Sequence, residues 1–247
     1  MAEKIRVTIW NEYRHEVNDE DIAKLYPKGI HGQIASFLSE EPDMEVRTAT
    51  LDEPDHGIPD AVLDDTDVLL WWGHMNHGDV RDDRVEYIRH RVYTGGMGFI
   101  ALHSGHHSKP FRALVGATGN LSWGDNQHEI LWNLKPSHPI AAGIPDHFHL
   151  EEEELYAEPF YIPNPDDLIL GGWFEQGYIF RSCCTFTRGV GKIVYLQPGH
   201  ESVPTYYNPY IQRIIKNAVR WARPNDFGYE IKNEAPYVTS ALEPEEK

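Results

Sequence analysis

Gly98-Phe99-Ile100-Ala101-Leu102-His103-Ser104-Gly105 is a short apolar run that passes directly into a polar, glycine-containing turn. Residues 101–105 have the outline of a nucleophile elbow, a sharp turn between a strand and a helix that exposes one side chain above a sheet. The residue at the elbow is usually a Ser or Cys that attacks an acyl carbon, but here it is His103. Because an imidazole is better suited to transfer protons, bind a metal or donate a hydrogen bond, the segment predicts a hydrolase-like scaffold without acyl-transfer chemistry.

Strand patterns and helix patterns alternate on both sides of the elbow. Residues 5–10 and 44–51 are predicted strands, and the continuous apolar run 68–72 is typical of a buried parallel strand. Apolar residues recur at helical spacing from Gly29 to a point before Pro42, and again over residues 85–92. This alternation implies βαβ crossovers, so it predicts an α/β fold with a parallel sheet covered by helices on both faces.

The pattern changes between about residue 124 and residue 197, where short runs are separated by Pro and Gly. We expect an antiparallel β extension and a final core strand there, over residues 129–134, 168–173, 178–186 and 192–197. An amphipathic helix is predicted over residues 210–221. An α/β chain of this length is routinely one domain, so we expect a single domain over residues 1–223 and a loose C-terminal tail over residues 224–247.

The composition excludes several classes of partner. The 39 Asp and Glu residues outnumber the 22 Lys and Arg residues and give a formal charge of −17, which opposes binding to nucleic acid or to an anionic membrane. The chain has no apolar stretch long enough to span a bilayer and opens without an apolar signal segment, so we expect a cytoplasmic protein. The two cysteines, Cys183 and Cys184, are adjacent, which leaves neither a disulfide framework nor a spaced zinc pair.

Polar side chains follow four of the predicted strands. Open α/β sheets bind ligands outside the carboxyl ends of their strands, so we expect these four groups to share one cavity. The groups are Glu12 with His15, His74 with His77, His103 and Ser104 with His106 and His107, and His200 with Glu201.

Two of these groups place histidines three residues apart, at His74 and His77 and at His103 and His106. Zinc sites use this separation in helical or tightly turned backbone, so one interpretation is a divalent metal site, with zinc as the expected ion. Glu12 or Glu201 could complete such a site. The other reading is that the imidazoles bind sugar hydroxyls or one another. The metal hypothesis names His74, His103, His106 and His200 as ligands.

His200-Glu201 suggests a base with a carboxylate that orients it, although adjacent residues on an extended chain point in opposite directions. The run 151–154 is either a solvated acidic segment or part of a strand. As a strand, it places one face toward a cleft, made of Glu152, Glu154, Tyr156 and Glu158. Five histidines away from these strand ends are expected at the surface, namely His56, His90, His138, His147 and His149.

Several of these segments together resemble the trehalose-utilisation, or ThuA-like, family of the class I glutamine amidotransferase-like fold. The resemblance implies a flavodoxin-like parallel sheet and a role in the metabolism of trehalose, a related disaccharide or a keto-sugar. It spans residues 5–221 and rests on Val7-Thr8-Ile9-Trp10-Asn11-Glu12 with Arg14-His15, Gly29-Ile30-His31-Gly32, Trp71-Trp72-Gly73-His74, Leu102-His103-Ser104-Gly105, Arg181-Ser182 and Pro198-Gly199-His200-Glu201.

The sequence departs from the amidotransferase pattern at the residues that hydrolyse glutamine. His103 replaces the elbow cysteine, Ala101 replaces the first glycine of the elbow, and His200-Glu201 lacks the residue that separates His from Glu in that pattern. No thiolate therefore stands where attack would occur, and we expect no glutaminase activity.

The resemblance and the strand-end residues together give two functional hypotheses. The first is a sugar-modifying enzyme, with His103, His200 and Glu201 as catalytic residues. Its expected substrate contacts are Glu12, His15, His31, His74, Ser104, Glu154, Tyr156 and Arg181. The second is a sugar-binding or regulatory module without catalysis. Both take a small sugar as ligand, and self-association into a homo-oligomer is compatible with either.

Overall fold

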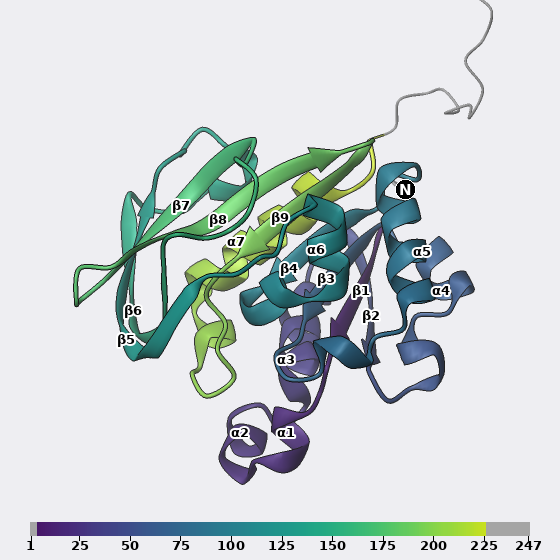
Figure 1. The fold of residues 1–247 in the computed structure, drawn as a ribbon, viewed down its shortest axis with the longest axis horizontal. Helices are drawn as coiled ribbons and strands as arrows, with labels where there is room; N and C mark the ends of the chain where they lie inside the picture. Colours follow the sequence, from purple (N-terminus) through teal and green to yellow (C-terminus); the bar gives the residue numbers. More distant parts are fainter. Residues whose placement is uncertain (1–3, 226–247) are drawn as a thin grey trace, which may run out of the picture.

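The computed structural model describes residues 4–225, and within this part of the chain nine strands form one sheet in the order β2-β1-β3-β4-β9-β8-β7-β5-β6 (Figure 1). The first five strands in this order are all parallel, with the order 2-1-3-4-5 of flavodoxin-like sheets. The predicted α/β fold is therefore confirmed. The parallel strands are β1 (Ile5–Asn11), β2 (Met44–Thr50), β3 (Val68–Trp72), β4 (Gly98–Leu102) and β9 (Gly191–Leu196).

Helices cover both faces of the parallel strands, because each helix has one apolar stripe and the buried strands are apolar on both faces. α3 (Gly29–Leu38) and α7 (Pro209–Ala222) pack on one face. The other face is covered by α4 (Asp60–Asp64), α5 (Asp82–Tyr93) and α6 (Lys109–Val115). Two short helices, α1 (His15–Asn18) and α2 (Glu20–Leu25), follow β1.

The antiparallel extension continues the sheet from β9, at the end opposite α4 and α5 (Figure 1). It contains β8 (Ile179–Arg188), β7 (Asp167–Phe174), β5 (Ser122–Asn133) and the edge strand β6 (His147–Ala157). Residues 151–154 lie in β6, so the strand reading of this acidic run is the correct one. Two irregularities in the pairing of β5 with β6 shift the register beside it.

Two sequence predictions need correction. His138 was expected at the surface, but it is buried against Trp221 because its Nδ1 accepts the backbone N–H of Ile140 at the start of a 3-10 turn. β5 begins at Ser122, seven residues before the predicted start, in a polar stretch with no apolar alternation.

Within residues 4–225 no helix is both long and apolar enough to cross a membrane. Residues 226–247 of the predicted tail lie outside the described residues.

Candidate functional site

The predicted elbow is present, and it holds His103 in a strained backbone conformation. β4 ends at Leu102, and His103 begins a 3-10 helix with φ at +49°, a left-handed value that is rare for a residue with a side chain. Gly105 allows this turn to pack closely, since a Cβ there would lie 3.0 Å from the carbonyl oxygen of Trp71. The elbow was expected to expose its side chain, but His103 is fully buried.

His103 is fixed at both ring nitrogens. Its Nδ1 lies 2.9 Å from the carbonyl oxygen of Gln197, and a carbonyl only accepts, so Nδ1 carries the proton. Its Nε2 lies 3.0 Å from Oε2 of Glu154 and 3.3 Å from the hydroxyl of Tyr156. The ring also stacks on Tyr156, with centroids 5.0 Å apart. The imidazole therefore contacts both Glu154 and Tyr156 through Nε2.

The electrostatics of this pair favour the charged form of both partners. Burial disfavours a protonated imidazole, but the adjacent Glu154 carboxylate outweighs burial and raises the pKa of His103 above its usual 6.5. Burial likewise disfavours the carboxylate, but the contact with His103 lowers the pKa of Glu154 below its usual 4.5. Each partner of this pair thus favours the charged form of the other.

His200 lies beside this pair, and its pKa is shifted in the opposite direction to that of His103. Its ring centroid is 5.4 Å from that of His103, and burial, assisted by the positive charge of His103, lowers the pKa of His200. Its Nδ1 accepts the backbone N–H of Ser202 at 3.3 Å, and the Ser202 hydroxyl lies 2.8 Å away. A neutral ring whose Nδ1 accepts carries its proton on Nε2, so His200 can donate a hydrogen bond there.

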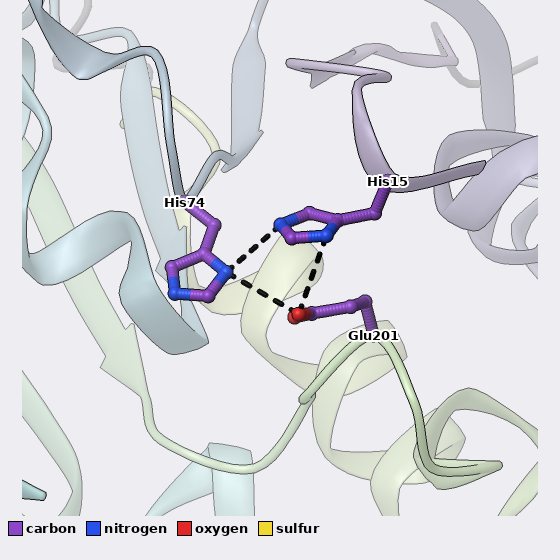
Figure 2. Close-up of side chains that lie close together, drawn as sticks. All are labelled: His15, His74 and Glu201. Atoms are coloured by element: carbon purple, nitrogen blue, oxygen red, sulfur yellow. Dashed lines mark hydrogen bonds and ion pairs between the residues drawn. The ribbon is translucent and has the colours of Figure 1, made fainter. Parts of the chain in front are cut away.

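Side chains from the loops after β1, β3 and β9 form a second cluster beside the first. It consists of His15, His74 and Glu201. Figure 2 shows His15, His74 and Glu201 converging on one point. Nε2 of His15 lies 2.9 Å from Nδ1 of His74, and Oε1 of Glu201 lies 3.4 Å from Nδ1 of His15 and 3.3 Å from Nδ1 of His74. Burial opposes ionisation of Glu201, but His74 and the other imidazoles outweigh it and hold the pKa of Glu201 at about 2.

Two buried carboxylates anchor the loops that carry these side chains. The Glu12 carboxylate accepts the backbone N–H groups of His74, Met75 and Asn76 at 2.8–2.9 Å. The Glu153 carboxylate accepts the backbone N–H groups of Gly199 and His200 at 2.9 and 3.0 Å and also the Thr205 hydroxyl. Both carboxylates therefore hold main chain in place below the site and are nearly inaccessible to solvent.

A cavity of about 450 Å³ opens above these groups at the carboxyl edge of the sheet. Six of the predicted site residues line it, and they come from loops after β3, β4 and β9 and from strand β6. These residues are His74, Ser104, His106, Glu154, Tyr156 and His200. The wall is completed by His77, His107, Asn120, Leu121 and Trp123.

The family description "Trehalose utilisation" (ThuA) matches residues 6–222 of the chain. The chain belongs to the ThuA family. No curated protein sequence matches it significantly. Solved structures share the fold of this ThuA protein at low sequence identity. A ThuA-like protein from Parabacteroides merdae has a TM-score of 0.69 and 13% identity, over 95% of this chain and 94% of its own.

Two further structures extend this comparison. A ThuA-like protein from Bacteroides uniformis has a TM-score of 0.63 and 12% identity, over 90% of this chain and 92% of its own. A Salmonella typhimurium structure described as cytoplasmic protein STM3548 has a TM-score of 0.57 and 10% identity, over 90% of this chain and 100% of its own. At these identities the likeness establishes the fold, and the ThuA chemistry has to be argued from the site itself.

Four predicted substrate contacts of this ThuA protein do not line the cavity. Glu12 lies below it as a loop anchor, and His15 reaches it only through His74 and Glu201. His31 lies against Asn11, with its Nδ1 2.9 Å from the Asn11 amide nitrogen. Arg181, on β8, forms an ion pair with Glu158 and lines a different, apolar groove.

The metal set predicted from the sequence is not assembled as one group. Among the described residues, two groups of three present ligand atoms within 4.8 Å of one another. One is His15, His74 and Glu201, and the other is His103, Glu154 and His200. His106 belongs to neither group, and its Nδ1 donates to the carbonyl of Gly119 at 2.7 Å. Burial lowers the pKa of His106 to about 3, so its ring is neutral.

Sequence reasoning missed two buried carboxylic acids beneath the ThuA site, Glu153 and Glu129. Glu153 lies in the acidic run but faces inward, next to the exposed Glu152. Glu129 on β5 is also fully buried, and burial raises its pKa well above the usual range. One feature of the sequence does indicate that Glu153 is buried. It lies shortly before the continuous apolar run 155–157 that ends β6.

Proposed function

We propose that this ThuA protein is a carbohydrate-modifying enzyme that transfers a proton on an oxidised sugar, with Glu154 as the base and His200 as a hydrogen-bond donor. The family description names trehalose utilisation, which supports trehalose or a related disaccharide as the parent of the substrate. A cavity of about 450 Å³ falls within the usual size range of small-molecule sites. Its mixture of imidazoles, a carboxylate and aromatic faces suits a ligand with both hydroxyls and C–H surface.

The observation that carries the proposal is the 3.0 Å contact between buried His103 and Glu154, which borders the cavity. A general base must be ionised and must reach its substrate. The His103 charge lowers the pKa of Glu154 and so meets the first condition, and the position of Glu154 in the cavity wall meets the second. Full burial makes His103 a positioning residue in this scheme, although the sequence predicts a catalytic one.

A carboxylate base combined with a neutral imidazole donor fits proton abstraction from a carbon next to a carbonyl group. Glu154 takes the proton, and the electrons of the broken C–H bond form a C=C bond while the carbonyl oxygen gains negative charge. His200 donates its Nε2–H to that oxygen and stabilises the charge as it develops. A sugar in which one hydroxyl has been oxidised to a carbonyl offers such an acidic carbon, whereas trehalose itself does not.

Deuterium exchange tests this scheme. The protein is incubated in D₂O with trehalose and with a keto derivative of trehalose, and NMR follows exchange at the carbon beside the carbonyl. We expect catalysed exchange only in the keto-sugar, and a loss on the order of 10²- to 10⁴-fold in Glu154→Gln. Glu152→Gln is the matched control, because Glu152 is exposed on the same strand and does not line the cavity.

Thermal shifts measured with the same sugars separate binding from chemistry, since a bound ligand raises apparent stability. Sugar binding without exchange or turnover would support the sugar-binding module instead. Exchange that survives in Glu154→Gln would overturn the role of Glu154.

The proposal includes a cytoplasmic location, and the structurally similar Salmonella protein carries that description.

A further inference from the structure

His15, His74 and Glu201 have the spacing of ligands around one metal ion. Two ligands of a tetrahedral zinc ion, each at about 2.0–2.2 Å from the metal, lie about 3.3–3.6 Å apart. Oε1 of Glu201 lies 3.3 Å from Nδ1 of His74 and 3.4 Å from Nδ1 of His15, and the other ring nitrogen of His15, Nε2, lies 2.9 Å from Nδ1 of His74. With one ligand atom taken from each residue, the three atoms lie within 4.8 Å of one another. Two imidazoles and one carboxylate are also a donor set that zinc sites use. Figure 2 shows the three side chains pointing toward one another from three separate loops.

Glu201 supplies a second observation. Its side chain is 6% exposed, yet its Oε2 atom is buried without a hydrogen-bond partner among the described residues. A buried carboxylate oxygen without a partner is costly, and a metal ion beside Oε1, the oxygen that faces the two imidazoles, would satisfy Oε2 as well if both carboxylate oxygens bound it. We infer that His15, His74 and Glu201 form a binding site for a divalent first-row transition metal, with zinc as the expected ion.

Each of the three ligands is held in position by a neighbouring group. The backbone N–H of His74 is bound by the Glu12 carboxylate, and the chain just before Glu201 is held by Glu153. The ring of His15 packs edge-on against Trp72, with centroids 6.0 Å apart. Such outer contacts orient metal ligands before the ion arrives, so this site needs little rearrangement to bind.

The site opens toward the cavity, because His74 is both a ligand and part of the cavity wall. Three protein ligands leave a fourth position for water or a substrate oxygen, which is the arrangement of catalytic rather than structural zinc. A sugar hydroxyl or carbonyl oxygen is the class of ligand that this position would take. The inference does not depend on the proposed function, since His103 and Glu154 are not among the three ligands.

Metal titration of the chelator-treated full chain tests the inference. We expect one zinc ion per chain by isothermal titration calorimetry. Glu201→Gln and His15→Ala should each weaken zinc binding on the order of 100-fold or more, because each leaves two ligands of three. Glu201→Gln keeps the size of the side chain, and circular dichroism checks that each variant is folded. His107→Ala is the matched control, because His107 lines the cavity but is not one of the three ligands. This variant should bind zinc as tightly as the wild type does.

Cobalt substitution gives a readout of the ligands that is independent of activity. The visible absorption of bound Co²⁺ should be present in wild type and His103→Ala, and absent in Glu201→Gln. If His103→Ala loses the metal while His15→Ala binds it fully, the ion lies in the group of His103, Glu154 and His200, and the inference is wrong. The absence of any stoichiometric binding would also overturn the inference. A variant that binds zinc but lacks proton exchange, such as Glu154→Gln, separates this test from that of the proposed function.

Discussion

Nε2 of His103 lies 3.0 Å from Oε2 of Glu154, so a fully buried imidazole supports the carboxylate that borders the cavity. In amidotransferase-like proteins the residue at the elbow is a nucleophile, which has to meet the substrate. The same strained backbone here presents a ring that meets only protein groups. In the proposed mechanism, the elbow therefore positions a base that lies on another strand, Glu154 on β6.

Replacing the supporting ring should change the pH dependence of activity. In His103→Gln the positive charge that lowers the pKa of Glu154 is lost, so this pKa rises toward or above its usual 4.5. We expect an acidic limb of the pH–rate profile that lies at higher pH than in the wild type, and therefore slower proton exchange on the keto-sugar at low pH, where less of Glu154 is ionised. An unchanged limb would show that His103 does not control the ionisation of Glu154.

The same pair should contribute to stability over a defined pH window. The pKa of His103 is raised in the folded state, so its contribution is complete below its unfolded value of 6.5 and is lost as pH rises through the folded value. The pKa of Glu154 is lowered, so its contribution is complete above 4.5 and is lost as pH falls through the folded value. Urea unfolding of wild type and His103→Gln should therefore differ most between pH 4.5 and 6.5. A difference that grows above that range would contradict the assignment.

Glu153 should be essential for the stability of the fold, whereas the preceding residue, Glu152, should not be. Glu153→Ala leaves the buried donors of Gly199, His200 and Thr205 without their acceptor, at a cost of about 2–4 kcal/mol in the free energy of unfolding. The exposed Glu152 should tolerate Ala within about 0.5 kcal/mol. Chemical denaturation of both variants measures the contrast, and equal costs would refute the anchoring role.

The two cysteines should be inert in the folded protein. Both lie buried in β8, and burial raises the pKa of Cys184 to about 12 and that of Cys183 well above the usual range. We expect no ammonia release from glutamine, and labelling by a thiol reagent only after unfolding. Rapid labelling of the native protein, or a glutaminase activity that disappears in Cys183→Ser, would contradict this expectation.

The parallel half of the fold could be predicted from the sequence because its signals are local. β3 and β4 have the predicted bounds, since each is a continuous apolar run that ends at a polar residue. The convergence of the loops that carry His74, His103 and His200 follows from the rule that parallel strands end at one edge. The left-handed conformation of His103 agrees with the elbow motif.

The extension and the anchors could not be predicted in the same way. Alternation along β6 places Glu152 with Glu154, but Glu152 is exposed, while Glu153 and Glu154 are both buried next to an irregular stretch of β5 pairing. Which polar atom meets which backbone N–H also depends on tertiary geometry. The sequence therefore indicates Glu12 as a site residue, and only the structure shows that it binds three consecutive backbone N–H groups.

The anchoring of the loop after β3 by Glu12 has a consequence for how specificity can diverge. The carboxylate binds N–H groups of residues 74–76, and every amino acid except proline has this group. The exposed side chain of Met75, next to two histidines of the cavity wall, can therefore be exchanged without loosening the loop. A substitution at this position in a relative would therefore change an exposed surface beside His74 and His77, while Glu12 keeps the loop and its histidines in place.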